Sequence, residues 1–169
     1  MIVLVIRGLL SVWLSRAMET LSARLSSHGM ANVLTDHGNA MCWFCNVKAM
    51  TQQCVDAKMR GEKIVLVGHS FGATSVLMIA RALNTLGILV DFAGPIDPAH
   101  QYDTSAPHNI LRGVSFYQLT PGQLGQGIVK PSNPDVWSIS RRDETHLAIA
   151  ADPIVQDAMF NGVKLCLKP

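Results

Sequence analysis

The sequence predicts an α/β fold: a three-layer α/β/α sandwich in which helices cover both faces of a mostly parallel sheet of about six strands. Short runs rich in Val, Ile and Leu alternate with longer segments whose apolar residues recur every three or four positions. Of the 169 residues, 49% are hydrophobic and only 15% are charged, which suits a sheet buried on both faces. At this length, residues 1–169 fit one domain.

The first half of the chain alternates strands with helices. Its opening β-branched run is continuous, as in a strand buried on both faces, until residues 7–10 interrupt it. Leu14, Met18 and Leu21 recur at helical spacing, and Gly29 is a suitable helix end. The elements expected here are strand 2–6, helix 12–27, strand 32–35 and helix 40–60.

The second half continues the alternation and ends in a helix. Asp152 can cap that helix, with Pro153 at its first position, and Asn161 with Gly162 marks its expected end. Prolines within 94–98 are expected to end regular pairing after the fourth strand. The elements expected before the last helix are strand 64–67, helix 72–86, strand 88–93, strand 114–119 and strand 136–140.

Strands that alternate with helices predict parallel pairing with right-handed crossovers. The simplest strand order is 2-1-3-4-5-6, which reverses between the first and third strands. Open α/β sheets bind ligands at such a reversal, outside the carboxyl ends of the strands. Gly8, after the first strand, and Ser70, after the third, are expected to meet there.

Residues 63–73, KIVLVGHSFGA, contain the motif G-x-S-x-G between an apolar strand and a helical pattern. In that context, a sharp strand-to-helix turn exposes the serine at the end of the sheet. The sequence therefore predicts that Ser70 is a nucleophile rather than part of a structural turn.

A serine hydroxyl needs a base to take its proton and a carboxylate to orient that base. Asp97 follows the fourth strand at the same sheet edge as Ser70 and is the preferred acid, with Asp91 and Asp103 as alternatives. His146, after the sixth strand, is the preferred base. The order along the chain is Ser, Asp, His.

The other histidines are assigned lesser roles. His100 and His108 follow Asp97 too closely to come from a separate later strand, and His28 is expected to be solvated near a helix end. His69 should point away from Ser70 by strand alternation and serve in packing. His37 follows the second strand on the functional edge, where it either lines a substrate pocket or is an ordinary loop residue.

GHSFGA on a strand–turn–helix, together with the order Ser, Asp, His, resembles the α/β-hydrolase family over nearly the whole chain. The chain looks like a minimal α/β-hydrolase fold without a large lid, similar to small lipase, cutinase-like and thioesterase-like members. The resemblance implies an oxyanion hole made by the backbone N–H groups of Leu9 and Phe71. The family often has His-Gly before the donor at the position of Leu9, whereas this chain has Arg7-Gly8.

The resulting hypothesis is a metal-independent and cofactor-independent serine hydrolase of the esterase, lipase or thioesterase type. Its substrate would be a small-molecule or lipid-like acyl ester, cleaved through an acyl-enzyme. An acyltransferase with the same triad and a non-catalytic binding protein on this fold are the alternatives. The sequence leaves the acyl chain, the leaving group and the oligomeric state open.

Charge and cysteine content argue against other classes. A net charge of +2 without a basic cluster does not predict nucleic-acid binding. Residues 1–10 lack a basic n-region and are too short to span a bilayer, so no integral membrane segment is expected and a cytoplasmic location is favoured. Cys42 and Cys45 have C-x-x-C spacing, but free thiols are preferred for all four cysteines, which include Cys54 and Cys166.

Overall fold

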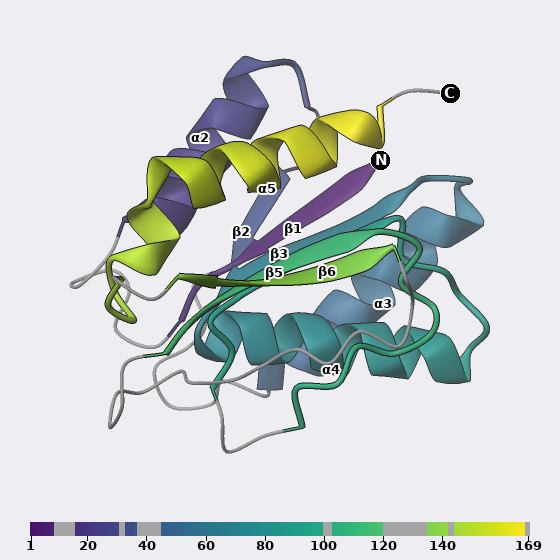
Figure 1. Ribbon diagram of the computed structural model, residues 1–169. Coiled ribbons are helices and arrows are strands. Elements are labelled where there is room, and N and C mark those ends of the chain that lie inside the picture. The colour runs from purple at the N-terminus through teal and green to yellow at the C-terminus, as the bar shows by residue number, and fades with distance from the viewer. Residues whose placement is uncertain are drawn as a thin grey trace.

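The computed structural model contains a six-stranded sheet in the order β2-β1-β3-β4-β5-β6, with every pair of neighbours parallel (Figure 1). This confirms the predicted fold class and strand order. The residues that the structure describes are 1–8, 16–30, 33–36, 45–99, 103–119, 135–141 and 144–167.

The strands are β1 (Ile2–Ile6), β2 (Val33–Asp36), β3 (Ile64–His69), β4 (Phe92–Ile96), β5 (Gly113–Gln118) and β6 (Val136–Arg141). The helices are α2 (Ala17–Ser27), α3 (Cys45–Met59), α4 (Phe71–Thr85), α5 (Pro153–Leu165) and the short 3₁₀ helix η1 (Ile149–Ala151). Helices α2 and α5 cover one face of the sheet, and α3 and α4 cover the other (Figure 1).

Alternate side chains of β1 enter the two halves of the core. Ile2, Leu4 and Ile6 pack with the apolar residues of α3 and α4, whereas Val3 and Val5 pack with those of α2 and α5. Burying one such aliphatic side chain contributes about 1.5–3 kcal/mol. The continuous apolar run therefore stabilises both layers and fixes β1 in the sheet interior.

Helix α2 begins later than the sequence pattern indicates. Helix α2 starts at Ala17, because Arg16 has non-helical dihedral angles, although its expected start was residue 12. Helix α3 is described from Cys45 onward, and its expected start at residue 40 lies outside the described residues. The intervening positions 9–15 and 37–44 lie outside the described residues. Gly29 follows α2 with φ of 77°, the left-handed conformation expected at a helix end.

The prediction for β4 was wrong: the strand is Phe92–Ile96 rather than 88–93, and it continues through Pro95. The backbone N–H groups of Ala93 and Asp97 donate to carbonyl oxygens on the β5 side, at 3.0 and 2.7 Å. Pro95 lies midway between these donors and has no N–H group. The strand therefore forgoes one bond to β5 and keeps those on either side.

The beginning of α5 was predicted correctly and its end was not. Asp152 Oδ1 accepts a hydrogen bond from Ile154 N at 2.7 Å, and Pro153 is the first helical residue. The helix then continues through Gly162 to Leu165. A Cβ atom at Gly162 would lie 2.2 Å from the ring of Phe92, so this glycine permits close packing of α5 on β4 and does not end the helix.

Replacing Gly162 with Ala is expected to destabilise the protein by about 1–3 kcal/mol, because overpacking against Phe92 outweighs the gain of about 1 kcal/mol in helix propensity. Denaturant unfolding measures the difference. The exposed neighbour Asn161, changed to Ala, serves as the control and should retain or increase stability. Equal effects of the two substitutions would contradict the packing explanation.

Among the described helices, none is both long and apolar enough to cross a membrane. Two cysteines in the described part of the chain, Cys54 and Cys166, are free and buried thiols. Burial raises the pKa of the Cys54 thiol to about 12, so this group stays protonated. Cys42 lies outside the described residues.

Candidate active site

The G-x-S-x-G motif forms a tight turn between β3 and α4. Ser70 lies between these elements with φ of 59° and ψ of −123°, in the half of backbone space that side chains other than glycine rarely occupy. A Cβ atom at Gly68 would lie 2.5 Å from the carbonyl oxygen of Gly72, and one at Gly72 would lie 2.3 Å from the carbonyl oxygen of Ile6. Both glycines are therefore required for the close backbone contacts that place Ser70 at the carboxyl edge of the sheet.

The chain that follows β1 also contacts the turn. A Cβ atom at Gly8 would lie 2.7 Å from Ser70 Cβ, so the predicted meeting of these residues is confirmed. The adjacent Arg7 side chain is largely buried and forms an ion pair with Glu19 of α2 at 2.9 Å. This ion pair ties the beginning of the β1–α2 connection to the α2 helix.

Of the two residues expected to supply oxyanion donors, Phe71 lies within the described part of the chain and Leu9 lies outside it. Phe71 is the first residue of α4, and backbone N–H groups at a helix N-terminus favour negative charge. Leu9 lies outside the described residues, and so does His37, the candidate substrate-lining histidine.

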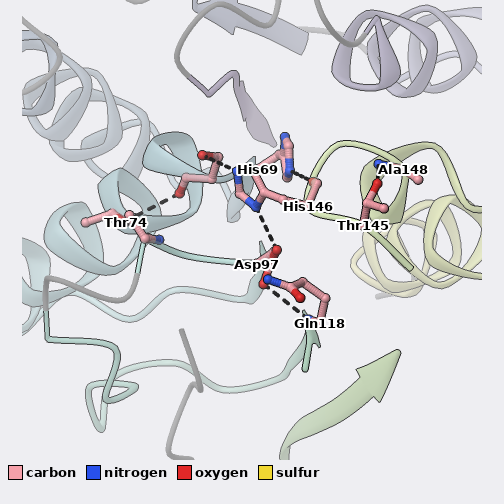
Figure 2. Close-up of polar contacts among 9 residues, drawn as sticks. His69, Thr74, Asp97, Gln118, Thr145, His146 and Ala148 are labelled. Atoms are coloured by element: carbon pink, nitrogen blue, oxygen red, sulfur yellow. Dashed lines mark hydrogen bonds and ion pairs between the residues drawn. The ribbon is translucent and has the colours of Figure 1, made fainter. Parts of the chain in front are cut away.

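Ser70, His146 and Asp97 form one chain of hydrogen bonds. His146 Nε2 lies 2.8 Å from Ser70 Oγ. His146 Nδ1 lies 2.7 Å from Asp97 Oδ2 (Figure 2). An ionised carboxylate only accepts hydrogen bonds, so Nδ1 carries a proton. In the neutral ring, Nε2 then carries no proton and accepts a hydrogen bond from the Ser70 hydroxyl group. A general base requires this arrangement.

Asp97 is held rigidly at the end of β4. Its side chain is fully buried, its φ is 46°, and its N–H group donates to Phe116 O at 2.7 Å. Oδ1 accepts a hydrogen bond from Gln118 N at 3.2 Å, while Oδ2 bonds to His146. Burial raises the pKa of the Asp97 carboxyl, and the hydrogen bonds from His146 and Gln118 offset part of that rise.

The two alternative aspartates have other partners. Asp91 Oδ2 accepts a hydrogen bond from Ile64 N at 2.9 Å, at the beginning of β3. Ser70 follows the other end of that strand, roughly 20 Å away at about 3.3 Å per residue. Asp103 forms an exposed ion pair with Arg81 at 3.0 Å. The carboxylate that bonds to the His146 ring is that of Asp97.

His69 is buried as expected, but it also contacts His146. Its Nε2 donates a hydrogen bond to the His146 carbonyl oxygen at 2.8 Å, and the two ring centroids lie 4.8 Å apart (Figure 2). Burial lowers the pKa of His69 to about 3, with a further lowering from the charge on His146. Sequence reasoning missed this contact, because nothing local to His69 indicates which loop covers it.

The loop that carries His146 is anchored at both ends. An ion pair between Arg141, at the end of β6, and Asp152, the cap of α5, joins the two ends of the loop. Within the loop, Thr145 Oγ1 accepts a hydrogen bond from Ala148 N at 3.2 Å. Gln156 of α5 donates to Ala150 O at 2.6 Å. These bonds hold the backbone on both sides of the histidine.

A cavity of about 540 Å³ opens at the other edge of the sheet, where the strands begin. Its walls include Lys63, Asp91, Arg112 and Cys166, and none of the residues around Ser70. In the part of the chain that the structure describes, no three His, Cys, Asp or Glu side chains cluster closely enough to hold a metal ion.

Comparison with known proteins supports the fold. No protein-family model matches the chain, and the search of curated proteins gives no significant match. Among solved structures, the chain is similar to a protein of unknown function from Agrobacterium tumefaciens that is provisionally classed as an α/β hydrolase. The TM-score is 0.54 at 14% identity, over 97% of this chain and 84% of that chain. What the two share is the α/β fold.

The buried His69 predicts a specific dependence of stability on pH. Between pH 6.5 and about 3 the unfolded chain binds a proton at this residue and the folded protein does not, so stability should fall as the pH falls. In His69→Gln this loss should be less steep, as measured by urea unfolding at several pH values. His28→Gln, at an exposed histidine, is the control. An unchanged slope in His69→Gln would contradict the neutral assignment.

Proposed function

We propose that the protein is a serine hydrolase that cleaves a carboxylic ester or thioester through an acyl-enzyme intermediate. The observation that carries this proposal is the continuous hydrogen-bond chain from Ser70 through His146 to the buried Asp97. The groups proposed as nucleophile, base and orienting carboxylate therefore lie within hydrogen-bonding distance of one another. The distant structural neighbour is compatible with hydrolase chemistry.

In the first half-reaction, Ser70 Oγ attacks the acyl carbonyl carbon while its proton passes to His146 Nε2. The tetrahedral oxyanion would accept hydrogen bonds from the backbone N–H groups of Phe71 and Leu9. As the intermediate collapses, His146 returns the proton to the leaving alcohol or thiol. The acyl group remains on Ser70 as an ester.

In the second half-reaction, water takes the place of the leaving group. His146 accepts a proton from water as its oxygen attacks the acyl-enzyme, and then returns a proton to Ser70 Oγ. The products are a carboxylic acid and the free serine. Asp97 remains ionised throughout and stabilises the imidazolium in each half-reaction.

Burial explains why Asp97 suits this role. A carboxylate removed from water is poorly solvated, so its attraction to a nearby imidazolium is stronger than at the surface. Its bonds from Gln118 N and His146 Nδ1 fix both oxygens, so the site needs little reorganisation when charge appears on the ring.

Ser70→Ala should abolish hydrolysis of short-chain activated esters and covalent labelling by a fluorophosphonate probe, because no other group would be in place to attack. Turnover assays and mass spectrometry of the labelled protein measure both. Ser27→Ala, at an exposed serine of α2, is the control and should behave as the wild type. Wild-type protein that is folded but never labelled would favour a binding protein on this fold instead.

Asp97→Asn should lower kcat by about 10⁴-fold, since the amide no longer selects the correct tautomer of His146. It should not lower stability at neutral pH, because burial already disfavours the Asp97 charge. Steady-state kinetics and thermal melting test the two effects. Asp91→Asn is the matched control, and equal loss of kcat in both variants would exclude a specific role for Asp97.

A further inference from the structure

His69 and His146 come from distant parts of the chain and contact each other directly. His69 ends β3, immediately before Ser70, and His146 lies on the β6–α5 loop. The His69 ring is buried, with its Nε2 donating to the His146 carbonyl oxygen at 2.8 Å and its plane tilted 34° from the His146 ring. The residue next to the nucleophile thus holds the backbone of the base.

This contact completes the support of the His146 ring. The two ring nitrogens bond to Ser70 and Asp97 at 2.8 and 2.7 Å, which fixes the plane of the ring but not the backbone that carries it. The bond from His69 fixes that backbone to β3. Since Ser70 extends from the same strand, a displacement of the loop relative to the nucleophile would have to break this bond.

The donor must also be uncharged. The reaction proposed above forms an imidazolium at His146, and a second positive charge with its ring centre 4.8 Å away would oppose that step. A lysine or arginine here would donate a hydrogen bond and raise the energy of the imidazolium. A histidine that burial keeps neutral donates from Nε2 without adding charge.

We propose that His69 is a positioning residue, which holds the His146 loop so that the imidazole stays aligned between Ser70 and Asp97 during proton transfer. This inference rests on the proposed function. His69 exchanges no proton with the substrate, and it acts only through the backbone carbonyl of His146. Small misalignments of reacting groups can cost about 100-fold in rate.

Three substitutions of His69 distinguish the effect of its hydrogen-bond donor from the effect of its side-chain volume. Gln can place an amide N–H group near the position of histidine Nε2, Asn is too short to do so, and Leu fills the space without a donor. We expect His69→Leu and His69→Asn to lower kcat by about 10- to 100-fold with little change in KM. His69→Gln should recover most of the loss.

Rates are normalised to the active sites that fluorophosphonate titrates, so partial unfolding does not imitate a loss of kcat. If Leu does not fold, the Asn and Gln pair still isolates the donor. His28→Gln, at an exposed histidine, is the control and should match the wild type. Wild-type kcat in His69→Asn, or equal losses in Asn and Gln, would overturn the proposal.

A second readout does not depend on activity. The proton on His146 Nδ1, bonded to Asp97, should give a resolved NMR signal in the free protein. In His69→Asn this signal should shift and exchange faster with water, and in His69→Gln it should return toward the wild type. An unchanged signal in His69→Asn would overturn the positioning role even if Ser70 proved not to be catalytic. Turnover that persists in Ser70→Ala would overturn the proposed function and leave this test of the positioning role unaffected.

Discussion

The close approach of three backbone segments is the constraint on which the candidate site depends. The turn at Ser70 touches the end of β1 and the first turn of α4 at distances that leave no room for side chains at Gly68, Gly72 or Gly8. A positive φ at Ser70 is unfavourable by itself, by roughly 1–3 kcal/mol. The sheet supplies the compensation, because β3 is buried along its whole length and fixed between β1 and β4.

The residue that follows β4 has the same kind of backbone conformation as the residue that follows β3. Asp97 follows β4 as Ser70 follows β3, and these two are the only described residues other than glycine with a positive φ. Ser70 N donates to Ile96 O at 2.9 Å, and Asp97 N donates to Phe116 O at 2.7 Å. Each strained residue is therefore tied to the neighbouring strand by its own backbone. The register of parallel strands consequently sets the spacing between the serine and the carboxylate.

The sequence predicted those features that depend on local pattern or chain order. Strand order followed from the alternation of elements, and the motif around Ser70 together with the order Ser, Asp, His singled out three residues that the structure joins by hydrogen bonds. Local rules failed where a distant segment decides the outcome. The local sequence around Gly162 indicates a helix end, and only the contact of this residue with Phe92 explains why a glycine lies within the helix.

Pro95 shows the same limitation in a strand. A proline normally indicates the end of pairing, because its missing N–H group leaves a neighbouring carbonyl without a donor. Here the missing donor falls between two bonds that remain, and knowing this requires the register of β4 on β5. His69 is similar, since its partner lies 77 residues later in the chain and is brought to it by the β6–α5 loop.

Asp97 and His69 are both buried in contact with His146, but Asp97 accepts hydrogen bonds whereas His69 donates one. It disfavours charge on Asp97 and on His69 alike. Asp97 receives hydrogen bonds from Gln118 N and His146 Nδ1, which favour its ionised form. His69 donates to a carbonyl, which its neutral form already satisfies. His146 thus lies between a buried carboxylate that would attract a positive charge on its ring and a buried histidine that adds none, which is the arrangement that the proposed hydrolase reaction needs.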